Sequence, residues 1–337
     1  MKLLMFVAFM MIISISGGCG WHDDKNIRHS GVDVENIQVE NYFEIGPNIE
    51  YFTQIPSRVM VIGAAQTETL LDLEVGDSIK WAVKYEDSKD FPIKESNQEE
   101  FQKLAFISRQ EITLESVLEL KPDLIVSEES WFSKNRLGST GYWNSKGIHT
   151  MVSLNTTSPG KMNKQETVER EMKYIHDMGR IYHREKQAET IILATNSRFD
   201  AVRKNAKGTP PKVMILDLLS TTVSYGRDKI AGDIAAKLGG EVPVTTAMIS
   251  DEVVVNENPD VVFIITYDDT ESRLNSVRNK KAFQHLKFIQ NNRLHGIPLK
   301  YAYGPMTRVI DSAGYMAMYM YPGQFIFAKE YDFHSKN

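Results

Sequence analysis

A short phrase that occurs twice in the chain limits the folds it can adopt. Residues 112–126 read ITLESVLELKPDLIV, and residues 249–263 read ISDEVVVNENPDVVF. In each copy a glutamate, Glu115 or Glu252, stands seven residues before Pro-Asp and an apolar run. The copies are 252 − 115 = 137 residues apart, which is too far for a solenoid repeat. The phrase therefore predicts two similar lobes, each with one equivalent glutamate, and a cleft between them as the place to look for function.

Strands and helices alternate within both predicted lobes. Short apolar runs that read as buried strands occur at residues 59–63, 79–83, 124–126 and 147–154 in the first lobe, and at 212–216, 261–266 and 293–297 in the second. Helical segments are predicted at residues 67–76, 229–238, 278–290 and 306–321. This alternation predicts an α/β fold of two lobes with mainly parallel sheets.

A long helix is predicted between the lobes. Residues 164–207 contain no proline and a single glycine, Gly179, and their apolar side chains recur every three or four positions. We expect one helix that bends near Gly179 and ends at the Gly-Thr-Pro-Pro sequence 208–211. The predicted division is therefore an N-terminal lobe at 51–160, a linking helix at 161–208 and a C-terminal lobe at 209–330.

The N-terminus has the features of an export signal. The apolar run Leu3–Ile15 follows Lys2 and is shorter than the ~20 residues that a membrane span needs. Cys19, the one cysteine of the chain, follows two glycines and resembles the lipobox of bacterial lipoproteins, with Ser16 where leucine is usual. We expect a signal peptide at 1–18, a tether at 19–50 anchored through lipidated Cys19, and an extracytoplasmic location. The alternative is an ordinary signal peptide with an incidental cysteine.

Composition excludes several classes of function. The net charge is −5 and there is no long basic block, which argues against nucleic acid as a partner. The chain has no G-x-S-x-G, Walker or G-x-G-x-x-G motif, so an enzyme on the same two-lobe shell is the less favoured alternative. No close His/Asp/Glu cluster predicts a bare Zn or Mn site, and we expect a monomer without a cofactor.

In order along the chain, several segments resemble the class III substrate-binding proteins of ABC importers, which carry iron-siderophores, haem and cobalamin. The resemblance covers residues 58–322 and is carried by segments 58–68, 114–125, 232–240, 258–261 and 292–294. It implies two α/β lobes that are joined by a long helix and dock on a membrane permease with its ATPase. It also implies that one glutamate per lobe, here Glu115 and Glu252, pairs with permease arginines.

Both glutamates have a simpler explanation as well. Thr113 and Ser250 read as helix N-caps, and a glutamate in the first turn is favoured by the helix dipole by ~0.3–1 kcal/mol. The repetition at matched positions, together with the lipidation signal, favours docking.

Loops at the carboxyl ends of the predicted strands supply the ligand-site candidates, because parallel α/β sheets bind ligands at this edge. The stretch 128–143 holds two of the four tryptophans, which indicates either an aromatic wall or a cluster that pins a long loop. Arginines in such loops are candidate clamps for anionic chelates. The candidates for ligand binding are Arg109, Trp131, Tyr142, Trp143, Tyr225, Arg227, Tyr267, Tyr303 and Arg308.

The expected function is the capture of a metal chelate and its delivery to a permease. A pocket with several arginines favours a ferric siderophore over haem and cobalamin. Haem would need an axial ligand, for which Tyr225, Tyr267, Tyr301, Tyr303 and Met306 are available. For a siderophore no direct protein ligand to the metal is predicted.

Overall fold

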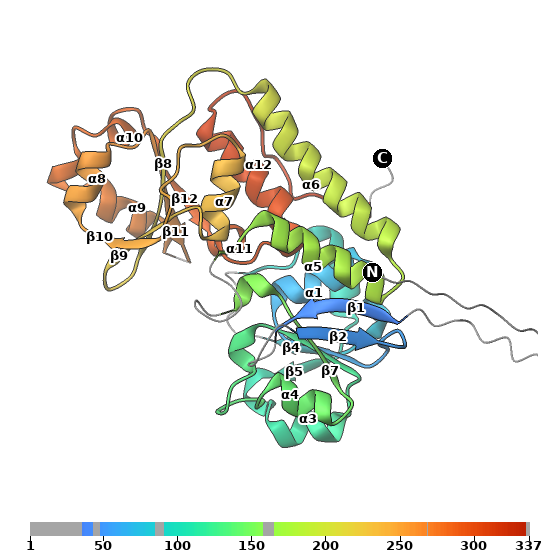
Figure 1. Ribbon diagram of the computed structural model, residues 1–337. Coiled ribbons are helices and arrows are strands. Elements are labelled where there is room, and N and C mark those ends of the chain that lie inside the picture. Colours follow the sequence, from blue (N-terminus) through green and yellow to red (C-terminus); the bar gives the residue numbers. More distant parts are fainter. Residues whose placement is uncertain (1–35, 43–47, 85–90, 158–164, 268, 335–337) are drawn as a thin grey trace, which may run out of the picture. The chain divides into compact units, whose positions relative to one another are not determined.

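Two five-stranded sheets, one in each lobe, organise the chain (Figure 1). The computed structural model describes residues 36–42, 48–84, 91–157, 165–267 and 269–334, so the predicted signal peptide and Cys19 lie outside the described residues. The N-lobe sheet has the order β5-β4-β3-β6-β7, and all neighbouring strands are parallel. Its strands are β3 Val59–Val61, β4 Ile79–Lys84, β5 Phe106–Ser108, β6 Leu124–Ser127 and β7 His149–Val152.

Helices follow the N-lobe strands; those at 64–72 and 114–120 lie where helices were predicted, whereas none was predicted at 98–102 or at 140–145, which was read as part of a loop. They are α1 Ala64–Asp72, α2 Gln98–Gln102, α3 Leu114–Leu120 and α4 Thr140–Ser145, with short 3-10 turns at Gly76–Ser78, Glu95–Asn97, Arg109–Glu111, Glu129–Trp131 and Leu154–Thr156. The residues of the central strands β3 and β6 are buried on both faces, because helices cover the sheet on two sides. This burial explains why the strands read as continuous apolar runs rather than as alternating ones.

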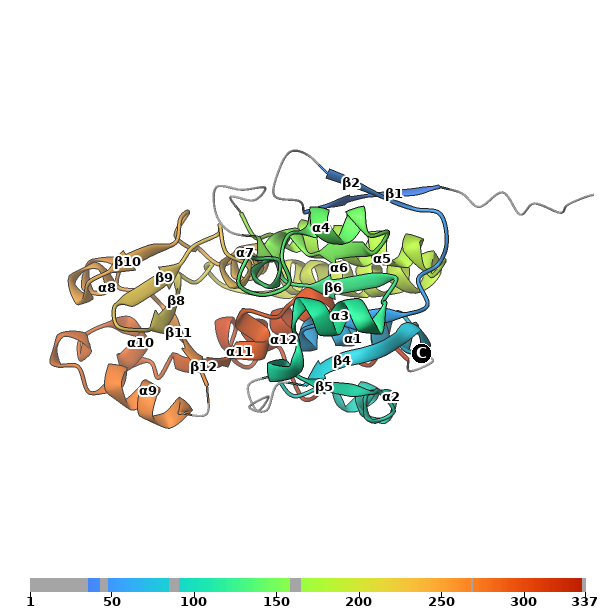
Figure 2. The same ribbon diagram turned by 90° about the horizontal axis from the view of Figure 1, so that it is seen from below.

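The C-lobe sheet has the order β10-β9-β8-β11-β12 and is parallel only in part. The parallel strands are β8 Val213–Leu218, β11 Val261–Thr266 and β12 Leu294–Pro298, while β9 Thr222–Tyr225 and β10 Ala247–Ile249 pair antiparallel at one side (Figure 2). The sequence had predicted a loop where β9 lies. The helices are α7 Ile230–Lys237, α8 Asp251–Glu257, α9 Thr270–Arg278, α10 Lys287–Gln290, α11 Leu299–Ala302 and α12 Val309–Met320, with 3-10 turns at Lys281–Phe283 and Met306–Arg308. The predicted two-lobe α/β fold with mainly parallel sheets is confirmed.

The predicted linking helix is present but divided. The long helix α6 Glu185–Asn205 is preceded by a separate helix, α5 Val168–Ile181, and His183 between them adopts a left-handed backbone with φ 51°. At Gly179 a Cβ atom would lie 2.5 Å from the Cβ of Ala188 in α6. Gly179 therefore permits the two helices to pack closely instead of bending one continuous helix.

Part of the predicted tether is structured. Strand β1, Ile37–Asn41, pairs antiparallel with β2, Asn48–Phe52, and alternates buried and exposed residues. Ile37 and Val39 face the core, and the side chain of Asn41 donates to the Thr150 carbonyl of β7 at 2.5 Å. The sequence had predicted a polar tether up to residue 50, and strand β1 was missed. A strand this short shows its alternating pattern in only two apolar residues, Ile37 and Val39.

The repeated phrase forms equivalent hydrogen bonds with the backbone in both lobes. In the N-lobe, the Asp123 carboxylate accepts from the backbone N–H of Arg58 at 2.9 Å, and the Arg58 side chain donates to the Leu120 carbonyl at the end of α3 at 2.7 Å. In the C-lobe, Asp260 accepts from the backbone N–H of Lys212 at 2.9 Å.

The basic side chain of the C-lobe copy acts in the same way, since Lys212 donates to the Glu257 carbonyl at the end of α8 at 3.0 Å. Both helices end in a left-handed residue, Lys121 with φ 51° and Asn258 with φ 41°. In both lobes the repeated phrase therefore connects the start of the first strand, β3 or β8, to the end of the helix that lies within the phrase, α3 or α8. In the part of the chain that the structure describes, no helix is both long and apolar enough to cross a membrane.

Candidate functional site

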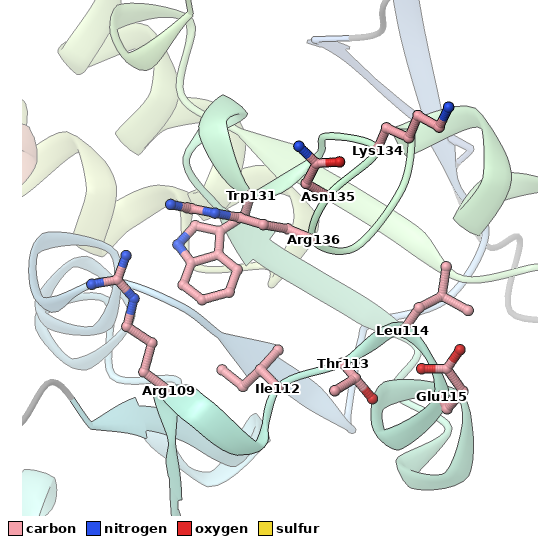
Figure 3. Close-up of a pocket in the computed structure, with 9 residues that line it drawn as sticks. All are labelled: Arg109, Ile112, Thr113, Leu114, Glu115, Trp131, Lys134, Asn135 and Arg136. Atoms are coloured by element: carbon pink, nitrogen blue, oxygen red, sulfur yellow. The ribbon is translucent and has the colours of Figure 1, made fainter.

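Three predicted residues, Arg109, Glu115 and Trp131, line a pocket of the N-lobe (Figure 3). This N-lobe pocket has a volume of about 470 Å³ and is lined by Arg109, Ile112, Thr113, Leu114, Glu115, Trp131, Lys134, Asn135 and Arg136. Arg109 follows strand β5 and Trp131 follows strand β6, so the pocket lies at the carboxyl edge of the parallel sheet, where such folds bind ligands. Tyr142 packs edge-on against Trp143 behind the same loop, with ring centroids 5.3 Å apart.

Positive charge and an indole dominate the N-lobe pocket. The guanidinium carbons of Arg136 and Arg109 lie 4.7 and 5.6 Å from the centre of the Trp131 ring. In Figure 3 the Arg136 side chain lies along the indole, and Glu115 stands at the far side of the pocket from Arg109. Three cations, Arg109, Lys134 and Arg136, and one carboxylate, Glu115, therefore line this pocket. Cations held over an aromatic face suit an anionic ligand with a flat or conjugated surface.

The positive charges of Arg109 and Arg136 also act on Glu128, which lies outside the pocket lining. Loss of hydration raises the pKa of its carboxyl above the ordinary value, and the positive charges of Arg136 and Arg109 oppose this rise. The two guanidinium groups thus act on a common region at the end of β6, which gives them a joint electrostatic role.

Trp143, by contrast, is a core residue. Its side chain is 0% exposed, and its indole Nε1–H donates to the Leu137 carbonyl at 2.8 Å. Its prediction as a ligand contact is wrong for this structure, because the ring is closed off from solvent. The alternative interpretation, a cluster that pins the long loop, describes both tryptophans, since they belong to one buried cluster, and Trp131 also borders the pocket.

A second group of predicted residues meets at the carboxyl edge of the C-lobe sheet. The phenol oxygens of Tyr225 and Tyr303 hydrogen-bond each other, and their rings meet edge-on with centroids 5.7 Å apart. The Tyr303 hydroxyl donates to Oδ2 of Asp217 at 3.0 Å. We call Tyr225, Tyr303 and Asp217 the tyrosine cluster. It brings together the ends of β8 and β9 and the residue after α11.

The tyrosine cluster contains a buried, incompletely satisfied carboxylate. Among the described residues, Oδ1 of Asp217 has no hydrogen-bond partner, and the nearest cation, Nη1 of Arg273, is 3.7 Å away. Burial raises the pKa of Asp217, and the Tyr303 hydrogen bond and Arg273 oppose that rise. Burial also raises the pKa values of Tyr225 and Tyr303, so both phenols are protonated at neutral pH. The cluster offers both donors and acceptors to a polar ligand group.

Two further candidates lie around the tyrosine cluster. Tyr267 follows β11, and the Arg273 guanidinium carbon lies 4.6 Å from its ring centre. Arg273 is itself held by Asp269, with Nε to Oδ1 at 2.7 Å. Arg227 is exposed two residues after Tyr225, and its backbone N–H donates to the Pro243 carbonyl. The structure therefore places Tyr267 beside the cluster and Arg227 at the surface near it.

Arg308 does not serve as a ligand clamp in this structure. Its side chain is buried, and its guanidinium forms a two-pronged ion pair with Glu68 of α1, with Nη2 to Oε1 at 2.6 Å. It also pairs with Glu330 at 2.9 Å. Burial alone would lower its pKa, but the two carboxylates outweigh burial and raise it. The prediction is corrected: its donors are used between segments 240 residues apart.

Glu115 and Glu252 occupy equivalent places in the two lobes. Each stands in the first turn of a seven-residue helix, α3 or α8, and each is exposed. Among the described residues the Glu115 carboxylate forms no ion pair. A hydrogen bond with Ser250 lowers the pKa of Glu252, so this carboxylate is ionised at neutral pH.

Several site residues were missed from the sequence. Lys134 and Arg136 lie in the loop that was singled out for its tryptophans, but exposed cations in a polar loop carry no signal of their own. Asp217 did leave a signal, because it interrupts the apolar strand Val213–Leu218 near its carboxyl end. Arg273 became a candidate only through its contacts with residues distant in sequence. Among the described residues, no three His, Cys, Asp or Glu side chains are grouped to hold a metal ion.

Comparisons with known proteins agree with this architecture. The sequence profile described as periplasmic binding protein matches residues 59–301. A periplasmic binding protein from Veillonella parvula is 28% identical, with 86% of this chain and 92% of that chain covered and a TM-score of 0.78. No curated protein matches the chain.

Two other solved structures share the fold at lower identity. One belongs to an ABC-type Fe3+-hydroxamate transport system of Saccharomonospora viridis; it is 15% identical over 86% of this chain and 100% of that chain, with a TM-score of 0.64. The other is the periplasmic haem-binding protein HutB of Vibrio cholerae, 18% identical over 79% of this chain and 100% of that chain, with a TM-score of 0.62. Because the profile covers most of the chain, the protein belongs to the periplasmic binding protein family and is a non-enzymatic solute-binding protein of the ABC-import class.

Proposed function

We propose that this protein captures a ferric siderophore or a related anionic metal chelate outside the cell membrane and delivers it to an ABC permease and its ATPase. The N-lobe pocket carries the proposal, since the guanidinium groups of Arg109 and Arg136 lie against the Trp131 ring and Lys134 lines the same pocket. Siderophore complexes present negative oxygen atoms on a conjugated or bulky frame, which matches cations held over an indole. In this proposal the tyrosine cluster supplies hydrogen bonds from the other lobe.

Haem or cobalamin is the alternative ligand within the same family. The phenols of Tyr225 and Tyr303 support haem, since a phenol oxygen can serve as an axial iron ligand. The cation excess of the N-lobe pocket favours the siderophore, because it pairs with several negative oxygens rather than with one metal atom.

Titration of the part of the chain from about residue 21 onward tests the proposal. Ferric siderophores, haemin and cobalamin are added in turn while tryptophan fluorescence and absorbance are recorded. We expect one anionic chelate to quench the fluorescence, and Trp131→Phe to remove most of that quenching. The double variant Arg109→Gln with Arg136→Gln should weaken binding at least tenfold. Unchanged affinity in this variant would exclude the N-lobe pocket, and no response to any of the ligands would exclude a metal-chelate function.

Delivery is proposed to depend on Glu115 and Glu252. Each exposed carboxylate can pair with an arginine of the permease in a two-pronged geometry, and two such pairs on separate lobes would fix the orientation of docking. The double variant Glu115→Ala with Glu252→Ala is expected to bind ligand normally but to lose complex formation with the permease and uptake. Normal uptake by this variant would remove the docking proposal.

Membrane attachment through Cys19 completes the proposal, and the residue lies outside the described part of the chain. Labelling of cells with a fatty-acid analogue should mark the wild-type protein but not Cys19→Ser, which should be released from the membrane fraction. Equal membrane retention of both forms would exclude the lipid anchor. The lipidated protein is proposed to act as a monomer that binds no nucleic acid.

A further inference from the structure

The antiparallel side of the C-lobe sheet continues the surface that carries the tyrosine cluster. Asp217 of β8 pairs with Val223 of β9, and Val223 pairs with Met248 of β10. Because directly paired residues project from the same face of a sheet, these three side chains form one row across three strands. Neighbouring strands are about 4.8 Å apart, so the row extends about 10 Å from the Asp217 carboxylate.

The two hydrophobic clusters that pack on opposite faces of the C-lobe sheet show on which face this row lies. Ile215 and Tyr225, which pair with each other, pack with the core cluster that contains α7 and α12. Leu218 and Ile249 pack with the separate cluster that contains Val254 of α8. The row of Asp217, Val223 and Met248 therefore shares its face with Tyr225, whereas α8 and Glu252 lie on the opposite face.

This row changes from buried and polar to apolar and exposed along its length. Asp217 is buried, Val223 is half-buried and Met248 is 75% exposed. The cross-strand contact between Val223 and Met248 helps to stabilise the short strands β9 and β10. This contact covers only part of each side chain and leaves the rest exposed. A methionine this exposed gains no stability from packing, and methionine adapts well to apolar ligands of irregular shape.

We propose that Val223 and Met248 form an apolar shelf that receives the carbon framework of the ligand while its polar, metal-bearing part lies at the tyrosine cluster. This inference rests on the proposed function and adds the ligand chemistry that the C-lobe selects. The continuity of the row with Asp217 and Tyr225 identifies the occupant, because a ligand held by the phenols and carboxylate must extend over one of its sides. The preferred ligands are chelates with an apolar body about 10 Å across; compact chelates covered by carboxylates are selected against.

Substitutions of similar shape test the shelf without disturbing the fold. Met248→Gln and Val223→Thr replace apolar atoms by polar ones, and Leu193→Gln makes the same type of change at an exposed site on α6 as a matched control. Affinities are measured by fluorescence titration for ferric enterobactin and haemin, which are anionic and have apolar aromatic bodies, and for ferric citrate, which is compact and polar. Urea denaturation checks that the variants remain folded.

We expect each shelf variant to bind at least one of the apolar-bodied chelates about tenfold more weakly, with less than a twofold change for ferric citrate and none for Leu193→Gln. Unchanged affinity for both apolar-bodied chelates, or an equal loss for ferric citrate, would overturn the shelf. If Tyr303→Phe lowers affinity while the shelf variants do not, the proposed function stands and the shelf is rejected. If the wild-type protein binds none of the chelates, the proposed function fails and the shelf fails with it.

Discussion

Removal of the Arg308 guanidinium is expected to lower the stability of the protein rather than to remove a ligand contact. Arg308 is 2% exposed and Glu68 is 1% exposed, so the pair is closed off from water. Without Arg308, the Glu68 carboxylate keeps the backbone N–H of Lys94 as a partner, at 2.6 Å, but loses two guanidinium hydrogen bonds. Removing one partner of a buried pair costs about 3–5 kcal/mol, because an uncompensated charge remains. Arg308→Met, which keeps an apolar side chain of similar length, should lose about this much.

Urea denaturation followed by circular dichroism measures the free energy of unfolding. Adding Glu68→Leu to Arg308→Met should restore part of the stability, because no buried carboxylate is then left unpaired. Arg136→Gln is the matched control: this exposed arginine should change stability by no more than about 0.5 kcal/mol while weakening chelate binding. If Arg308→Met instead keeps its stability within about 1 kcal/mol and loses chelate affinity, the structural role assigned to Arg308 is wrong.

Three further predictions concern groups away from the ligand site. Burial raises the pKa of Glu171 to about 7, above its value in the unfolded chain, so stability should fall as the pH rises from about 4.5 to 7. Glu171→Gln should therefore be more stable than wild type at pH 8 by up to ~3 kcal/mol and gain little at pH 4, and an equal gain at both pH values would contradict this. Asp123→Ala and Asp260→Ala should each lose about 1–3 kcal/mol in urea denaturation, since backbone N–H groups lose their acceptor; a loss in one lobe only would contradict the equivalence of these hydrogen bonds. Trp143→Phe should lower stability but leave ligand quenching intact, whereas Trp131→Phe should remove most of the quenching, and the reverse result would refute the assignment of the two rings.

Local periodicity was sufficient for most of the fold, and it failed where tertiary contacts decide. The apolar runs at Leu124–Ser127 and Val261–Thr266 are buried on both faces, so the strands could be recognised without alternation. The linking helix was predicted as continuous because α5 and α6 have compatible periods. Their separation depends on the left-handed backbone of His183 and on the close contact of Gly179 with Ala188. No sequence pattern shows which helix a glycine will touch.

The candidate site was predicted less completely, for a related reason. Both rings are buried and lie in one stretch of chain, and only their place in the fold separates Trp131, which lines the pocket, from Trp143, which does not. Arg308 has the chemistry of an anion clamp, but a glutamate 240 residues away holds its guanidinium. Asp217 enters the site through Tyr303, which follows it by 86 residues. Charges and rings in loops can be listed from a sequence, but their partners come from the fold.

The repeated phrase separates structural residues from residues that structure alone does not explain. Its aspartate accepts from the backbone at the start of the first strand in both lobes, so the Pro-Asp part has a complete local explanation. The glutamate has only a partial one, because its position in the first turn is worth no more than ~1 kcal/mol and many residues are tolerated there. The aspartate stabilises each lobe through its backbone hydrogen bond, whereas the glutamate contributes at most through its place in the first helical turn. The recurrence of an exposed carboxylate at the same turn in both lobes is what the proposed docking on a permease predicts, because that partner would contact both lobes at once.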